Sequence, residues 1–257
     1  MDKKQITKCL KRFLKETLFV HNIKCLFCGK ELEEDSKYCT CKKCLNSLPF
    51  LRGRVCTKCG EPLTGRGAFC ARCKGGKDRG FDVARAEFLY AGAIADAIKE
   101  LKYFGKKYYA EYLSNFLLDV YQRNDMNCDV VIPAPISQKS LRARGFNQVE
   151  LLCESFENVG MSVNTTCLAK VKETQNQVAL NFKDRQTNLV DAFKVIDVDA
   201  VKGKNVLLVD DIFTTGATAK EISTVLRSAG ANKVCVITLC HETIKKDEKT
   251  QIDGNNN

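Results

Sequence analysis

The chain has 257 residues, 44% of them hydrophobic, and a formal net charge of +10 at pH 7. This is the composition of a folded protein, and no apolar run reaches the roughly 18 residues that a membrane-spanning helix needs. The 15 cysteines are not accompanied by a signal peptide, which argues against a disulfide-linked secreted protein and predicts a cytoplasmic one.

Residues 1–20 interleave lysines with apolar residues in a helical pattern. The apolar residues that share one face are Ile6, Leu10, Phe13, Leu14 and Leu18. We predict an amphipathic N-terminal helix that packs on its own protein. Its lysine-rich opposite face leaves open an association with the inner face of the membrane.

Residues 21–79 contain most of the cysteines, and eight of these form four Cys-x-x-Cys pairs. The pairs are Cys25 and Cys28, Cys41 and Cys44, Cys56 and Cys59, and Cys70 and Cys73. Each pair presents two sulfurs from one tight turn, and two pairs complete a tetrahedral Zn²⁺ site. Cys39 is left over as a spare. We predict a double zinc-ribbon domain with two structural Zn²⁺ ions; the spacing favours two sequential sites, and a cross-braced arrangement stays open.

The basic charge is concentrated in the same part of the chain. Residues 1–80 contain 19 of the 41 Lys and Arg residues but only 8 of the 31 Asp and Glu residues. Such an excess favours contact with nucleic acid phosphates. The aromatic residues available there for stacking on bases are Phe27, Tyr38, Phe50 and Phe69. For most of them we prefer the alternative, in which they fill a small core beside the zinc ions.

After a Gly- and charge-rich joint at 74–79, short strands alternate with helices, which predicts a mostly parallel α/β sheet over residues 80–244. Strands are expected at 88–90, 130–132, 193–195, 206–209 and 234–239. Helices are expected at 94–103, 110–121, 149–156 and 220–229. The polar residues 245–257 predict a disordered tail.

The strand at 206–209 leads into two carboxylates, Asp210 and Asp211, and then into a small-residue loop. The loop residues are Thr214, Thr215, Gly216, Ala217 and Thr218. Ligands of open α/β sheets bind outside the carboxyl ends of the strands. A Gly- and Thr-rich loop that opens a helix suits a phosphate, and the carboxylates suit sugar hydroxyls or Mg²⁺. The segment predicts a sugar-phosphate site, with incidental acids or a receiver-like domain as the alternatives.

A second polar group follows the strand at 130–132. Its members are Ser137, Lys139, Arg142 and Arg144. Three cations within six residues, next to Gly145, suit a pyrophosphate group. A solvated basic loop would be preferred if the segment stood alone, but the sugar-phosphate motif favours binding.

Residues 206–218 resemble the 5-phosphoribosyl-1-pyrophosphate (PRPP) signature of type I phosphoribosyltransferases. The resemblance implies that Asp210 and Asp211 hold the ribose hydroxyls, that the 214–218 loop wraps the 5′-phosphate, and that Mg²⁺ accompanies PRPP.

Further motifs make the resemblance more specific. Besides the cysteine pairs, they are Leu-Lys-Tyr at 101–103, Ile-Pro-Ala-Pro at 132–135, Arg-Gly-Phe-Asn-Gln at 144–148, and the segment with Gln177, Arg185 and Asn188. In this order they resemble the ComF family of competence proteins over roughly residues 22–243. One departure is Leu45, where the family pattern suggests Trp. The resemblance implies a zinc-ribbon domain before a phosphoribosyltransferase-like domain. It also implies a role in natural transformation on incoming single-stranded DNA, with a DNA-uptake helicase or other competence proteins as partners.

Three functions compete on these grounds. In a phosphoribosyltransferase, Asp210, Asp211, Arg142 and Arg144 would be catalytic, the arginines stabilising the departing pyrophosphate. In a DNA-handling accessory, the PRPP site would sense or anchor a ligand. A protein–protein adaptor is the third. We favour a PRPP-binding domain with a zinc-ribbon module that serves DNA uptake, and leave transferase activity open.

Overall fold

The structure is a computed structural model that describes residues 24–32, 36–76, 78–172 and 191–243. The helix predicted at 1–20, the segment from Gln177 to Asn188 and the tail at 245–257 lie outside the described residues. The chain divides into two compact units between Ser47 and Leu48. The sequence, from its cysteine pairs and the Gly- and charge-rich joint at 74–79, predicts a domain boundary at residues 79 and 80.

The described part of the first unit is a small knuckle followed by one short helix. Lys24 and Glu31 form an antiparallel bridge around the first cysteine pair. Helix α2 (Lys42–Ser47) begins directly after Cys41 and carries Cys44 on its first turn. The spare Cys39 is buried and donates its thiol to the carbonyl of Lys24 at 3.2 Å. It lies outside both four-cysteine groups, in agreement with its interpretation as a spare.

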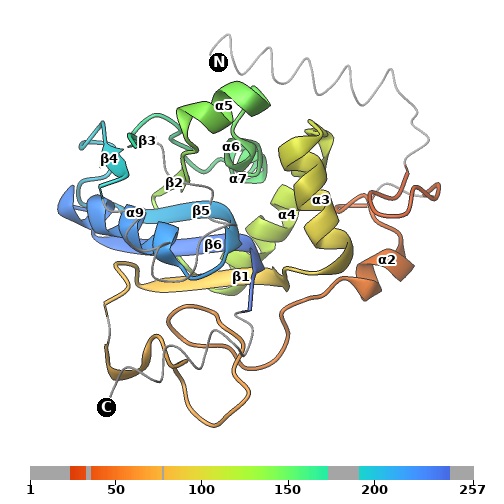
Figure 1. Ribbon diagram of the computed structural model, residues 1–257, viewed down its shortest axis with the longest axis horizontal. Coiled ribbons are helices and arrows are strands. Elements are labelled where there is room, and N and C mark those ends of the chain that lie inside the picture. The colour runs from red at the N-terminus through yellow and green to blue at the C-terminus, as the bar shows by residue number, and fades with distance from the viewer. Residues whose placement is uncertain (1–23, 33–35, 77, 173–190, 244–257) are drawn as a thin grey trace. The chain divides into compact units, whose positions relative to one another are not determined.

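The second unit is built on a four-stranded parallel sheet. Its strands are β1 (Val83–Leu89), β6 (Lys233–His241), β5 (Asn205–Phe213) and β2 (Val130–Pro133), in that spatial order (Figure 1). Their apolar runs are buried almost throughout, as is typical of parallel strands covered on both faces. The predicted parallel α/β sheet is confirmed. A separate antiparallel pair, β3 (Leu168–Lys170) and β4 (Phe193–Val195), was predicted only in its second strand.

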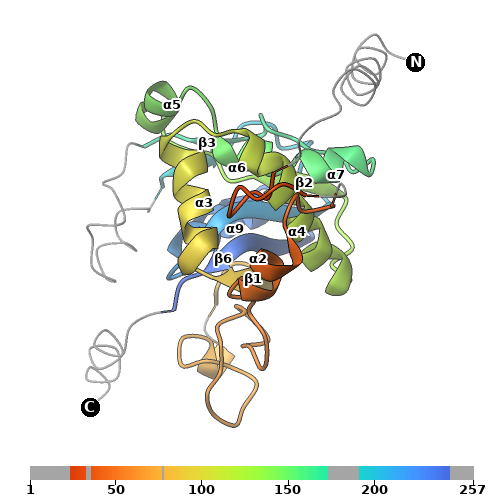
Figure 2. The same cartoon turned by 90° about the vertical axis from the view of Figure 1, so that its right-hand side faces the viewer.

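Helices cover both faces of this sheet. In Figures 1 and 2, α9 (Ala217–Ser228) lies on one side and α3 (Gly92–Tyr103) and α4 (Tyr108–Arg123) on the other. Ile222 and Leu226 of α9 pack against alternate residues of β5 and β6, among them Val206 and Val236. The helical periodicity of these segments makes them predictable from sequence.

Shorter helices connect β2 to the rest of the sheet. They are α5 (Gln138–Arg144), α6 (Gln148–Leu151) and α7 (Glu154–Asn158). A 3-10 turn, η1 (Lys74–Gly76), comes before the sheet. The prediction of one continuous helix at 149–156 is wrong, because the helix is interrupted at Leu152 and Cys153, between α6 and α7. Both breakpoint side chains are buried, so their apolar pattern resembles that of a continuous helix.

The second group of cysteines belongs to the core of the second unit. Cys56, Cys59, Cys70 and Cys73 are buried in one cluster with sheet and α9 residues such as Ala84 and Val236. The N–H of Ala84 in β1 donates to the carbonyl of Lys58 at 2.8 Å. A Cβ on Gly60 would lie 2.8 Å from the Ala84 carbonyl oxygen. This close approach requires glycine, and the positive φ of 73° favours it as well.

Candidate functional site: an acid pair, a phosphate-type loop and two four-cysteine groups

The acid pair, Asp210 and Asp211, lies in β5 beyond the point where the neighbouring strand β2 ends. The last residue pair between β2 and β5 is Pro133 with Val209, whereas β6 continues to pair with β5 as far as Phe213. Asp210 and Asp211 are therefore inside β5, rather than after it as the sequence predicted, but they have no β2 neighbour. This places them at the edge where open α/β sheets bind ligands.

The Asp211 carboxylate is paired with side chains of the protein. The residue is buried, its carboxylate lies 2.9 Å from the Lys102 Nζ, and it accepts a hydrogen bond from the Gln148 Nε2 at 2.7 Å. Burial alone would lower the pKa of Lys102, but the charge of Asp211 and the hydrogen bond to it outweigh burial, so this pKa is raised. The two acids, which the sequence treats as equivalent, are thus distinct: Asp211 is the anchored one.

Asp210 is the less buried of the two acids, since it is half-buried whereas Asp211 is buried. Burial, and then repulsion from Asp211, raise the pKa of Asp210 to about 7. Its Oδ1 accepts the backbone N–H of Asp211 at 2.8 Å. A carboxyl group with this pKa gains and loses its proton close to neutral pH, so a cation beside it would favour the ionised form.

The 214–218 loop is the start of helix α9. The helix begins at Ala217, three residues earlier than predicted, and Gly216 is its N-cap with φ 76°. A Cβ on Gly216 would lie 2.4 Å from both the Arg79 Nη2 and the Phe213 Cζ. The first backbone N–H groups of a helix have no acceptor within it, so this end of α9 suits an anion.

Two arginines from the cysteine-rich segment donate hydrogen bonds to the backbone of this loop. Arg72 Nη1 donates to the Thr215 carbonyl at 3.2 Å, and Arg79 Nη2 donates to the same oxygen at 2.7 Å. Arg72 is buried and forms an ion pair with Glu61 at 2.5 Å. Sequence reasoning missed both arginines, because more than 130 residues separate them from the loop.

Of the predicted pyrophosphate group, Arg144 is connected to the acid pair. It donates to Gln148 Oε1 at 2.7 Å, and Gln148 in turn contacts Asp211. Ser137 is the N-cap of α5 and accepts the N–H of Ser140 at 3.2 Å. Lys139 and Arg142 lie exposed on the same helix. Lys102 and Gln148 belong to motifs visible in the sequence, but the sequence alone does not indicate their contact with Asp211.

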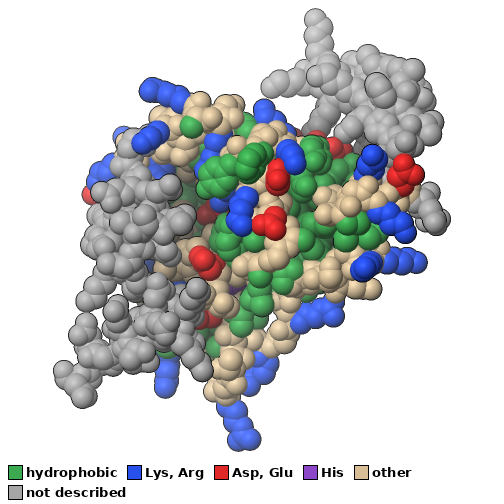
Figure 3. All heavy atoms as spheres, turned by 45° about the vertical axis from the view of Figure 1, so that its right-hand side comes forward, with side chains coloured by type: hydrophobic (Ala, Val, Ile, Leu, Met, Phe, Trp, Pro, Cys, Tyr) green, Lys and Arg blue, Asp and Glu red, His purple; other side chains and the backbone are tan. Residues whose placement is uncertain are grey.

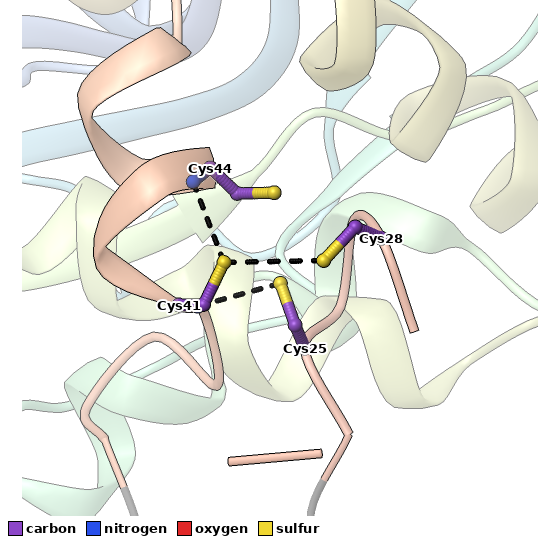
Figure 4. A group of neighbouring side chains, drawn as sticks. All are labelled: Cys25, Cys28, Cys41 and Cys44. Carbon is purple, nitrogen blue, oxygen red and sulfur yellow. Dashed lines mark hydrogen bonds between the residues drawn. The ribbon is translucent and has the colours of Figure 1, made fainter. Parts of the chain in front are cut away.

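The eight paired cysteines form two sequential groups of four, and the cross-braced alternative is excluded. Within each group the four Sγ atoms lie within 4.8 Å of one another. Figure 4 shows the four side chains of the first group pointing toward a common centre. The Cys28 and Cys41 sulfurs are 3.9 Å apart, and those of Cys59 and Cys70 are 3.5 Å apart. Sulfurs around a tetrahedral Zn²⁺ stand roughly 3.8 Å apart, so both groups fit this ion.

Backbone donors prepare the first group for a metal. Burial raises the pKa of Cys25, but N–H groups of Cys41, Cys28 and Phe27 outweigh it and lower the pKa to about 6. The N–H of Cys41 donates to the Cys25 sulfur at 3.3 Å. A thiol with this pKa is largely a thiolate at neutral pH, which is the form that binds Zn²⁺.

Comparison with known proteins gives the same two parts. A family described as a double zinc ribbon domain matches residues 16–74, and the phosphoribosyl transferase domain family matches residues 152–255. The DNA utilization protein YhgH of Escherichia coli K12 is 30% identical over 192 residues, which cover 72% of this chain and 83% of that protein. Competence protein ComFC of Bacillus subtilis is 25% identical, over 77% of this chain and 86% of its own length.

This chain belongs to the ComF family. Competence protein F of Haemophilus influenzae is a further relative, 27% identical over 84% of this chain and 95% of that protein. The family resemblance seen in the sequence motifs is confirmed, and so is the fold class of a phosphoribosyltransferase-type domain preceded by a cysteine-rich zinc-ribbon segment.

Among solved structures, an adenine phosphoribosyltransferase is similar to this ComF-family chain with a TM-score of 0.38 and 19% identity, covering 59% of this chain and 79% of its own. The glutamine PRPP amidotransferase of B. subtilis reaches a TM-score of 0.36 at 24% identity, over 54% of this chain and 30% of its own. Among the described residues, no helix has the length and apolar character needed to cross a membrane.

We expect the buried ion pair between Lys102 and Asp211 to contribute measurably to the free energy of unfolding. Lys102→Met leaves the buried Asp211 carboxylate without its counter-charge, so we expect the free energy of unfolding to fall by about 3 kcal/mol. Urea denaturation would measure it. Lys99→Met is the matched control on the same helix, since Lys99 pairs with Asp96 at the exposed surface and should change nothing measurable. Equal losses in the two variants would contradict the anchoring role.

Proposed function

We propose that this ComF-family protein binds Mg²⁺-PRPP in its phosphoribosyltransferase-type domain and assists the handling of incoming single-stranded DNA. The observation that carries the PRPP part is the presence, in one strand-to-helix segment, of a half-buried acid without a β2 neighbour, Asp210, and of a loop at a helix N-terminus whose backbone at position 216 favours glycine. The names of the relatives, competence proteins and DNA utilization proteins, support the DNA part.

The proposed roles follow from the surroundings of each residue. Asp210 accepts the ribose hydroxyls, and Asp211, tied to Lys102, keeps the strand edge in position. The 214–218 loop takes the 5′-phosphate. Arg144, with Arg142, Lys139 and Ser137 on and before α5, faces the pyrophosphate. Mg²⁺ would be held through PRPP and Asp210, because this hard cation takes oxygen ligands.

Two structural Zn²⁺ ions complete the proposal, one in each four-cysteine group. Zn²⁺ binding would neutralise half of the thiolate charge of each group and hold its two knuckles together. In the first group the knuckles belong to a unit in whose described residues few side chains are buried, so the metal would supply much of the stability of that described part.

Calorimetric titration with Mg²⁺-PRPP tests the PRPP part. We expect one binding site per chain and weaker binding of ribose 5-phosphate, which lacks the pyrophosphate that Arg144 would meet. Protein that takes up no PRPP at millimolar concentration, while folded and loaded with zinc, would refute the proposal.

Phosphoribosyl transfer is the second candidate function, favoured by the contact chain from Arg144 through Gln148 to Asp211. That chain links a cation to Asp211 through one side chain, Gln148, and a leaving pyrophosphate would need such a cation. Pyrophosphate release from PRPP in the presence of bases, amines or oligonucleotides would establish transfer. Binding of PRPP without release across such a panel would leave the accessory role.

A further inference from the structure

Three aromatic rings, Tyr103, Phe104 and Tyr108, lie exposed at the turn between α3 and α4. Their relative exposures are 62%, 70% and 53%, and one face of the Tyr108 ring packs on Tyr109, with ring centres 4.8 Å apart. We call these three residues the aromatic patch. The same stretch of chain buries other apolar side chains fully, including Leu101 and Leu113, so exposure here is not a general property of these helices. Rings left in water forgo the free energy of burial, and clustered exposed rings are typical of binding surfaces.

Basic side chains lie against and beside these rings. The Arg144 guanidinium is 5.3 Å from the centre of the Tyr103 ring, and Lys107 Nζ is 4.6 Å from the centre of the nearby Phe146 ring. Both ribbon views place α5, which carries Arg144, beside the C-terminal end of α3 (Figures 1 and 2). On the face turned forward in Figure 3, exposed hydrophobic side chains lie among basic and acidic ones.

The aromatic patch is continuous with the acid pair. Tyr103 directly follows Lys102, whose ammonium group pairs with Asp211. Arg144 contacts the Tyr103 ring on one side and Gln148 on the other, and Gln148 contacts Asp211. A molecule lying on the aromatic patch would therefore lie next to the proposed PRPP site.

The aromatic residues that the sequence suggested for stacking are mostly occupied elsewhere. Phe50 packs on Phe88, with ring centres 4.8 Å apart. Phe27 and Tyr38 are partly buried. Phe69 is the member of that set with an exposed ring, at 53%. The structure thus favours a different place for stacking from the one that the cysteine-rich segment suggested.

We propose that the aromatic patch binds single-stranded nucleic acid, with bases stacked on Tyr103, Phe104 and Tyr108 and phosphates near Lys107 and Arg144. This inference rests on the DNA-handling part of the proposed function and gives it a location. Every base offers a face for stacking, and cations beside the rings attract the backbone. A second copy of this chain fits less well, because a two-fold contact would bring the same cations together.

The absence of tryptophan from the sequence permits a direct test with single fluorescent reporters. Phe104→Trp places the reporter in the aromatic patch, and Phe69→Trp places it on the exposed ring of the cysteine-rich segment. An oligodeoxythymidylate of about 16 nucleotides is titrated into each. We expect saturable quenching of the Phe104→Trp reporter, weakening steeply as salt is raised, and no quenching of the Phe69→Trp reporter.

A second variant keeps the test independent of the reporters. Tyr103→Ala combined with Phe104→Ala and Tyr108→Ala should weaken oligonucleotide binding by about tenfold for each ring that stacks a base. Because the three side chains are exposed, its thermal unfolding and zinc content should match the wild type. If the triple variant unfolds at a lower temperature or contains less zinc, the single Phe104→Ala variant replaces it. We expect that variant to bind the oligonucleotide about tenfold more weakly.

The outcomes separate this inference from the function on which it rests. Wild-type affinity retained by the patch variants, or quenching of the Phe69→Trp reporter alone, would overturn the proposed location while leaving DNA handling intact. Wild-type protein that binds no oligonucleotide at low salt would overturn both. Patch variants that alter self-association instead of DNA affinity would identify a protein interface and overturn the nucleic-acid site.

Discussion

Cys70→Ala is expected to lose one zinc ion, to destabilise the α/β unit by about 3 kcal/mol or more, and to abolish binding of Mg²⁺-PRPP. Cys41→Ala is expected to lose one zinc ion as well, yet to leave the α/β unit folded and able to bind. The two substitutions remove the same kind of ligand, so the difference tests where each four-cysteine group belongs.

The physical reason lies in what surrounds each group. Cys70 is buried in the core cluster that includes β5, β6 and α9 residues, and it is two residues from Arg72, which holds the Thr215 carbonyl. Cys41 belongs to the separate unit that ends at Ser47. Loss of metal from the second group should therefore loosen both the core and the phosphate-type loop, whereas loss from the first should stay local.

Elemental analysis, thermal unfolding and PRPP titration of both variants would measure the difference. The wild type should contain two zinc ions per chain and each variant one. Equal loss of PRPP binding in the two variants would show that the first unit also supports the site. Unchanged zinc content in both would show that neither cysteine is needed to hold the metal.

Asp210→Asn is expected to lose PRPP binding by about a hundredfold and, at the same time, to stabilise the protein above pH 7. The loss follows from removing a charged acceptor, whose hydrogen bonds contribute about 1.5–3 kcal/mol each. The gain follows from the pKa of about 7, which burial and the charge of Asp211 impose on Asp210. Function and stability should thus change in opposite directions.

The sign of the pH dependence follows from proton binding. Between pH 4 and 7 folded Asp210 keeps a proton that the unfolded chain releases, so this residue makes the folded state progressively less stable as the pH rises through that window. Asparagine carries no such cost. We expect the variant to gain about 2 kcal/mol over the wild type at pH 8, allowing for partial solvent contact, and nothing at pH 4.

Chemical denaturation at pH 4, 6 and 8 would measure this gain. Asp96→Asn is the matched control, because Asp96 is an exposed acid on α3 and should show no pH-dependent gain. An Asp210→Asn variant that is less stable than the wild type at pH 8 would mean that the ionised carboxylate has a structural partner.

Local signals made much of the fold and of the metal groups predictable. The amphipathic periods of α3, α4 and α9 and the apolar run of β5 lie within single segments, and the Cys-x-x-Cys spacing is itself local. The sequential pairing needed the structure, because spacing only favours it. The sequence predicts one helix where the structure has α6 and α7, because Leu152 and Cys153, at the break between them, are buried and continue the apolar pattern.

The contacts that distinguish the site residues were not predictable, because they join distant segments. Asp210 and Asp211 are adjacent and chemically identical, and the contacts of Lys102 and Gln148, which are 109 and 63 residues from Asp211, make Asp211 the anchored acid. Arg72 reaches Thr215 over 143 residues. Exposure of the aromatic patch is likewise a tertiary property, since Tyr103 and Tyr108 are chemically the same as Tyr121, which contacts Phe156.

The bridge from Arg72 to Thr215 has a thermodynamic consequence. If bound metal holds Arg72 in place and so tightens the loop's grip on a phosphate, reciprocity requires the phosphate to tighten the second cysteine group's grip on its metal by the same factor. Competition with a chelator would then remove zinc from the second group more slowly, and at higher chelator concentration, when PRPP is present. Zinc in the first group would be removed alike with or without it, so each chain carries its own internal reference.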